Sequence, residues 1–189
     1  FAGLFSLVLC CSLAGIWQGS QGVALGKFLS AGDRGPAGGW IVYDKGSYSD
    51  GWRYIEAAPD VFVAGAWGEA RSFGMGNDSM ATGRGRANSL LIVNNSALPW
   101  CAARVAMMYR GGGMADWFLP SADELKIVYG MLIGKGIMEN KRLYWSSSEY
   151  SETQVWMVMG FDGGAVFPEN KIPANANAQP AFVWPVRYF

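Results

Sequence analysis

The stretch from Gly111 to Tyr150 constrains the fold of this chain more than any other. It begins with three glycines, passes through an aromatic corner with a proline, and continues as one helix-like segment. Ser121 and Glu124 have the spacing of a capping box, in which each side chain satisfies a backbone amide at a helix start. The apolar positions that follow recur at helical spacing and predict a buried stripe. They are Leu125, Val128, Tyr129 and Leu132.

A second helical segment is expected before this stretch, from Ala87 to Arg110, with an interruption at Pro99. Its apolar stripe consists of Cys101, Val105, Met108 and Tyr109. Glycine tolerates the left-handed conformation that ends many helices, so the glycines from Gly111 are predicted to stop this one. The region from Asp60 to Ala87 is rich in glycine and has no clear period, which predicts a long surface loop.

The other regular elements that the sequence predicts are β-strands. A hairpin is expected from two strands, Trp40 to Tyr43 and Trp52 to Ala57, with a turn at residues 44–47. Further strands are expected at 143–147, 154–161 and 165–167, and the second of these is apolar on both faces, as in a central strand. Ala181 to Phe189 is predicted to be the closing strand, with Phe182, Trp184, Val186 and Tyr188 on one face.

The composition excludes several kinds of chemistry. The chain has no histidine, which removes Ser-His-Asp and Cys-His catalysis and histidine-ligated zinc. Its three cysteines, Cys10, Cys11 and Cys101, form no CxxC motif, and their disulfide state stays open. Lysine plus arginine and aspartate plus glutamate both number 15, so no net positive charge favours nucleic acid. We therefore expect no enzyme, no cofactor, no metal site and no nucleic-acid partner.

The first 17 residues, Phe1 to Trp17, contain no charged side chain. Three interpretations remain open for them: an assembly or anchoring segment, the remnant of a signal or lipoprotein leader, and an ordinary core element. Residues 1–25 are accordingly treated as an apolar extension with a linker, and residues 26–189 as the main domain. In the assembly interpretation the segment packs against other subunits of a homo-oligomer, and membrane anchoring is also possible. The contacting residues would be Phe1, Leu4, Phe5, Val8, Ile16 and Trp17.

Several motifs together resemble a known family. The two most specific motifs are Asp116-Trp117-Phe118-Leu119-Pro120-Ser121 and Tyr144-Trp145-Ser146-Ser147-Ser148-Glu149. A third, FVWPVRYF, forms the last eight residues of the sequence. In this order they are similar to the bacterial C-type lectin-like domain found at the C terminus of collagen-like adhesins and in spirochaete-type surface lipoproteins. The resemblance implies an α+β, C-type lectin-like fold with two helices, antiparallel sheets and long loops.

The resemblance also implies a function. It predicts a non-enzymatic protein, extracellular or at the cell surface, that binds glycan or protein ligands in the manner of an adhesin. One departure is notable, because Trp184 stands where the family usually has arginine. The expected ligand-binding residues are Trp156, Asp162, Asn170, Asn175, Asn177 and Trp184. The alternative is a structural subunit of a self-assembling surface filament or layer, polymerised through the apolar N terminus.

Overall fold

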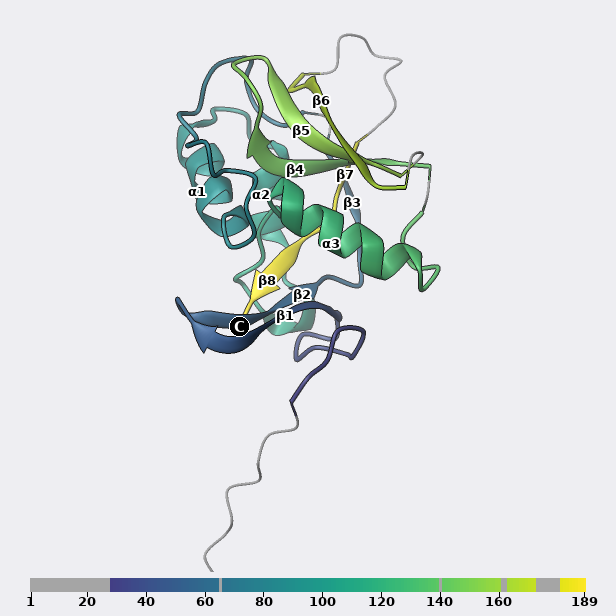
Figure 1. The fold of residues 1–189 in the computed structure, drawn as a ribbon. Coiled ribbons are helices and arrows are strands. Elements are labelled where there is room, and N and C mark those ends of the chain that lie inside the picture. Colours follow the sequence, from purple (N-terminus) through teal and green to yellow (C-terminus); the bar gives the residue numbers. More distant parts are fainter. Residues whose placement is uncertain (1–27, 65, 140, 161–162, 173–180) are drawn as a thin grey trace, which may run out of the picture.

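The computed structural model describes residues 28–189 except 65, 140, 161–162 and 173–180 (Figure 1). The predicted assembly residues Phe1, Leu4, Phe5, Val8, Ile16 and Trp17 lie outside this part, as do Asp162, Asn175 and Asn177. The described chain is α+β, with helices and two mostly antiparallel sheets. The helices are α1 (Gly85–Asn95), α2 (Ala102–Met108), the short 3-10 helix η1 (Gly111–Gly113) and α3 (Ala122–Ile133).

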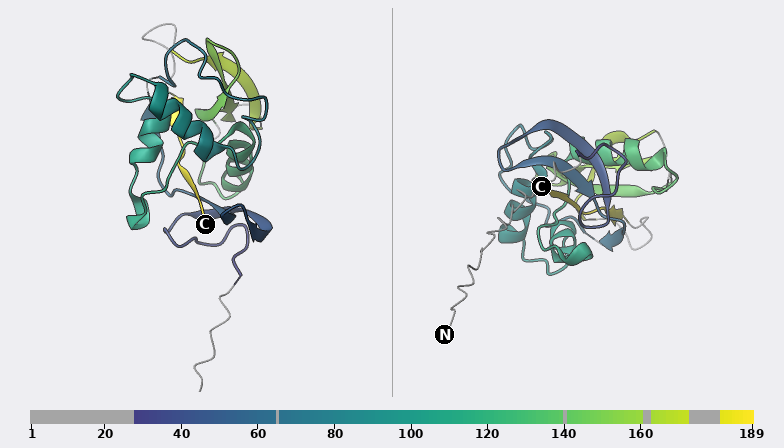
Figure 2. Two further views of the ribbon diagram at one scale, coloured as in Figure 1. Left: turned by 90° about the vertical axis from the view of Figure 1, so that its left-hand side faces the viewer. Right: turned by 90° about the horizontal axis from the view of Figure 1, so that it is seen from below.

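The last two strands of the chain belong to different sheets. The small sheet has the order β1 (Trp40–Ser49), β2 (Trp52–Ala57) and β8 (Val186–Tyr188). The large sheet has the order β3 (Phe62–Ala64), β7 (Ala181–Val183), β4 (Leu143–Glu149), β5 (Gln154–Met159) and β6 (Ala165–Asn170). Among the strand pairs of the described residues, only β4–β7 is parallel. Helix α3 lies between the two sheets and contacts strands of both, as Figures 1 and 2 show.

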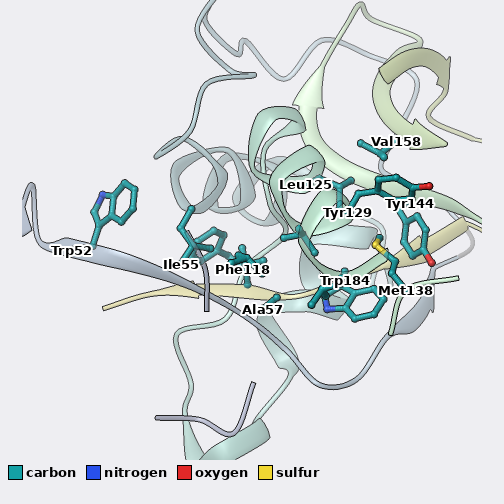
Figure 3. Packing of buried hydrophobic residues seen from close by; sticks show 14 residues of the cluster. Trp52, Ile55, Ala57, Phe118, Leu125, Tyr129, Met138, Tyr144, Val158 and Trp184 are labelled. Carbon is teal, nitrogen blue, oxygen red and sulfur yellow. The ribbon is translucent and has the colours of Figure 1, made fainter. Parts of the chain in front are cut away.

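The closing strand is not continuous, contrary to the prediction. It divides into β7 in the large sheet and β8 in the small sheet, with Trp184 and Pro185 between them. Proline has no N–H to donate to a strand partner, so the change of sheet occurs where pairing is interrupted anyway. Of the apolar residues predicted to share a face, Trp184 and Val186 belong to one core with α3, in which Figure 3 labels Trp184. Phe182 and Tyr188 are partly buried and pack against this core.

The first hairpin turns later than predicted. Strand β1 runs through residues 44–47 with an irregular register and reverses at Asp50 and Gly51, whose φ angles are 51° and 83°. Two consecutive positive φ angles are typical of the tight turn that Asp-Gly favours. The Asp-Gly pair was therefore the better signal of the reversal.

The helices agree with the sequence pattern in part. The interruption near Pro99 is confirmed, because α1 ends at Asn95 and α2 begins at Ala102. This division gives three α-helices in the described part of the chain, whereas the resemblance implied two. The capping box of α3 is confirmed: Glu124 N donates to Ser121 Oγ at 3.3 Å, and Ser121 N donates to Glu124 Oε2 at 2.9 Å.

Glu124 is more than a helix cap. Its side chain is fully buried and also accepts hydrogen bonds from Gly83 N, at 2.6 Å, and from the Tyr188 hydroxyl of β8. One carboxylate thus joins α3, the loop before α1 and the small sheet. Burial raises the pKa of Glu124, although the hydrogen bonds it accepts oppose the rise.

The close packing around Glu124 gives a stability prediction. A Cβ at Gly85 would lie 2.3 Å from Glu124 Oε2 and 2.8 Å from Ser121 N, so we expect Gly85→Ala to cost about 1–3 kcal/mol. Gly130 of α3 has nothing within 4 Å of such an atom, and Gly130→Ala should stabilise by about 0.5–1 kcal/mol. Urea unfolding of both variants measures the difference. Equal effects of the same sign would contradict the packing described here.

Candidate functional site

A polar pocket lies where the β4–β5 hairpin meets the glycine-rich loop that precedes α1. Its volume is about 370 Å³, and most of its lining is polar. We refer to it as the polar pocket. The loop contributes Ser72, Met75, Gly76, Asn77, Ser79 and Met80, and the hairpin contributes Glu149, Tyr150, Ser151, Glu152 and Trp156.

Two aromatic side chains form one wall of the polar pocket. Trp156 is half-buried on β5, between the buried neighbours Val155 and Met157, because alternate strand residues point to opposite faces. Tyr150 is 50% exposed, and its ring meets the Trp156 ring edge-on with centroids 4.7 Å apart. The sheet thus presents an aromatic pair to the pocket, with a ring surface on which a ligand can stack.

A buried ion pair supports the floor of the polar pocket. Lys171 follows β6, is fully buried, and donates from Nζ to Glu149 and, at 2.7 Å, to the Arg71 carbonyl. Glu149 also accepts from Phe73 N at 2.9 Å. Burial lowers the pKa of Lys171, and its contact with Glu149 opposes this change. The pair therefore fastens the loop around residue 71 to the edge of the large sheet.

Two aromatic rings of this loop also pack near the Lys171 ammonium. The Lys171 ammonium lies 4.9 Å from the Trp67 ring centroid and 5.1 Å from that of Phe73. Both rings are buried and meet edge-on, and Trp67 Nε1 donates to the Ser146 carbonyl at 2.7 Å. The prediction of a long surface loop from Asp60 to Ala87 is therefore wrong in part. This segment contains β3, and Trp67 and Phe73 insert into the core.

One of the serines after Trp145 holds a lining residue of the polar pocket, Ser79, against β4. The strand predicted at 143–147 contains the first two of these serines, and all three lie buried within β4, which extends to Glu149. Ser148 Oγ donates to the Ser79 carbonyl at 2.8 Å, and Asn88 Nδ2 donates to the same oxygen at 2.6 Å. These bonds fix Ser79 relative to the strand. The pocket is thus built from a loop that hydrogen bonds and an ion pair hold at both ends.

The structure separates the predicted ligand-binding residues. Trp156 lines the polar pocket. Asn170 is exposed on β6 opposite Gln154, outside the pocket lining. Trp184 is 3% exposed in the core and donates from Nε1 to the Ala58 carbonyl at 2.8 Å, so its assignment as a ligand contact is corrected to a core residue. Its ring belongs to the same buried cluster as Leu125 and Leu132 of α3.

Sequence reasoning missed several pocket residues. Tyr150 and Glu152 border the turn between two predicted strands, which was the available signal, because hairpin ends often carry binding residues. Ser72 and Asn77 had no comparable signal, since the glycine-rich loop lacks periodicity. The pocket offers hydroxyl groups, a carboxamide, a free carboxylate and an aromatic face. Such a set suits reversible binding of a polar ligand.

A scan against models of protein families finds no match for this chain, and a search of curated proteins finds no matching sequence. Among the described residues, no helix combines the length and apolar character needed to cross a membrane. Within the same part of the chain, no group of three or more Cys, Asp or Glu side chains is arranged to hold a metal ion.

Proposed function

We propose that this protein is a non-enzymatic binding module with a C-type lectin-like fold, acting outside the cell or at its surface, and that the polar pocket binds a glycan. The fold assignment is supported by the pairing of strands at the two ends of the described residues, since β2 pairs with both β1 and β8. The first strand and the last strand of the described chain therefore share one sheet. The long loop packed on the large sheet is also in keeping with such a fold.

The observation that carries the proposal is the Trp156–Tyr150 pair beside polar groups in one pocket. A sugar ring has an apolar face that stacks on an indole and hydroxyl groups that exchange hydrogen bonds with serine and carboxamide side chains. The pocket supplies Ser72, Asn77 and Ser151 for the second role. One stacked ring with a few hydrogen bonds is consistent with about 4 kcal/mol of binding free energy, a dissociation constant of about 1 mM per sugar.

A glycan array with two tryptophan variants tests the proposal. We expect the wild type to bind a subset of glycans and Trp156→Ala to bind them at least about tenfold more weakly, a loss of about 1.4 kcal/mol. Trp100→Ala is the matched control, because Trp100 is 65% exposed and lines a different surface. Thermal unfolding of each variant verifies that it is folded.

The array has clear contrary outcomes. If no glycan binds and a protein array yields a ligand that Trp156→Ala loses, the pocket binds protein instead. If a glycan binds equally to wild type and Trp156→Ala but not to Trp100→Ala, the polar pocket is the wrong site.

One observation favours the assembly function as a second candidate. An apolar groove of about 420 Å³ lies between β3 and α2. Three of its residues, Val63, Trp100 and Met108, are 56%, 65% and 52% exposed. The remaining lining residues are Phe62, Val105, Tyr109 and Arg110. Exposed apolar side chains gathered in a groove are typical of a protein interface.

The size of the particle in solution tests the assembly candidate. If this groove and Phe1 to Trp17 mediate self-association, the full chain sediments as an oligomer, and both Trp100→Ser and removal of residues 1–17 reduce its size. A full chain that remains monomeric at all concentrations contradicts the candidate. Gly130→Ala, which changes no groove residue, is the control.

A further inference from the structure

The charged side chains that line the polar pocket are acidic. Two of its lining residues are ionisable acids, Glu149 and Glu152, and no lysine or arginine is among the described residues that line it. Glu149 is neutralised by Lys171, whose ammonium is fully buried and cannot reach a ligand. The charge that remains for a ligand is therefore negative.

Glu152 supplies this charge at the mouth of the polar pocket. Its side chain is exposed, and no ion pair joins it to another described residue. Arg71 of the loop is outside the lining, and its guanidinium lies 4.7 Å from the Phe73 ring centroid. The carboxylate of Glu152 thus has no ion-pair partner among the described residues, and it borders the same pocket as the Trp156 and Tyr150 rings.

A carboxylate beside aromatic rings recognises a particular ligand group. Aromatic faces attract cations, and an adjacent carboxylate adds a direct ionic attraction. The same carboxylate repels the acidic sugars that carry carboxylate or sulfate groups. Serine hydroxyls and the Asn77 carboxamide remain available for the hydroxyl groups of a sugar ring.

We propose that the polar pocket selects glycans that carry a protonated amino group, that is, unacetylated amino sugars, and discriminates against acidic sugars. This inference rests on the proposed glycan-binding function and names its ligand class. Glu152 is the residue that determines the selectivity, and the aromatic pair provides the surface on which the sugar stacks.

Four methyl glycosides that differ in one substituent test the inference. They are the glucosaminide, the N-acetylglucosaminide, the glucoside and the glucuronide, measured at pH 6 by ligand-observed NMR with the full chain. We expect the glucosaminide to bind at least about threefold more tightly than the glucoside, and the glucuronide to bind most weakly. The preference should decrease in 1 M salt, where the screening length falls to about 3 Å.

Two variants locate the source of the preference. Glu152→Gln should remove the preference for the amino sugar while leaving the affinity for the glucoside within about twofold. Asp50→Asn removes the same charge from the exposed tip of the β1–β2 hairpin, in the other sheet, and should change neither value. Retention of the preference in Glu152→Gln would overturn the inference.

The outcomes separate this inference from the function on which it rests. If the glucoside and glucosaminide bind equally, or if the glucosaminide does not bind at all, the selectivity is wrong. The glycan array alone determines whether the pocket binds glycans. A set of neutral or acidic glycans on the array, lost in Trp156→Ala, would sustain the function and overturn the inference.

Discussion

Replacing Arg187 by methionine is expected to lower the free energy of unfolding by about 3–5 kcal/mol, the usual cost of removing one partner from a buried ionic group. Arg187 of β8 is 6% exposed and donates to Asp116 at 2.8 and 2.9 Å. It also donates to Glu56 Oε2 at 3.1 Å. Glu56 is fully buried and would remain without a cationic partner.

In Arg187→Met the loop before β1 should also be destabilised. Glu56 accepts hydrogen bonds from Ala37 N at 3.0 Å and Gly39 N at 2.8 Å, so the same carboxylate holds that turn against the small sheet. Chemical denaturation measures the change in stability. Arg53→Met is the matched control, because Arg53 pairs with Asp44 in a partly exposed ion pair at 2.8 Å, and its loss should be far smaller. Comparable losses in the two variants would contradict this description.

The pH dependence of stability provides a second readout of Arg187. Partial burial opposes ionisation of Asp116, but its hydrogen bond and attraction to Arg187 outweigh this and lower the pKa of Asp116. A lowered carboxyl pKa contributes stability above the unfolded value of about 3.9, and this stability is lost as the pH falls through the folded value. As the pH falls through the folded pKa of Asp116, the wild type should lose the stability that this carboxylate contributes. In Arg187→Met the free energy of unfolding should fall less over the same pH range, because Asp116 no longer has its partner.

Replacing Glu149 by leucine is expected to cost about 3–5 kcal/mol as well, because it leaves the Lys171 ammonium buried without its partner. The loop should detach from the large sheet, since Glu149 also accepts from Phe73 N at 2.9 Å. Urea denaturation gives the stability. Faster hydrogen exchange of the amides from residue 71 to 76 should accompany the loss.

The double variant distinguishes a charge effect from a shape effect. If the damage arises from an unpaired buried charge, adding Lys171→Met to Glu149→Leu should recover most of the lost stability, because an apolar pair can replace a buried ion pair. A double variant as unstable as the single one would show that the backbone hydrogen bonds of Glu149 matter more than its charge. Either result leaves Trp156 in place for binding measurements.

Local signals predicted the local parts of the fold. The capping box from Ser121 to Glu124, the helix break near Pro99 and the strands at Trp52 and Gln154 all depend on residues a few positions apart. The late turn at Asp50 and the division at Pro185 were missed for a different reason. Both depend on which strand is available for pairing, and that is a property of the whole sheet.

The candidate site could not be assembled from the sequence because its supporting contacts join distant positions. Lys171 bonds the carbonyl of Arg71 across 100 residues, and Glu149 bonds Phe73 N across 76. Trp156 was singled out as an aromatic strand residue, and the same criterion selected Trp184 incorrectly. An aromatic residue in a strand can point to the core or to solvent, and the local sequence does not distinguish the two cases. The difference depends on which other elements cover that face of the sheet.

The most direct test of glycan binding at the polar pocket follows the indole N–H signals of the nine tryptophans in a ¹H–¹⁵N spectrum during titration with a glycan from the array. We expect the Trp156 signal to shift with saturation, while the signals of the core residues Trp145 and Trp184 and of the exposed Trp100 stay in place. A saturable shift of Trp100 with no change at Trp156 would contradict the account.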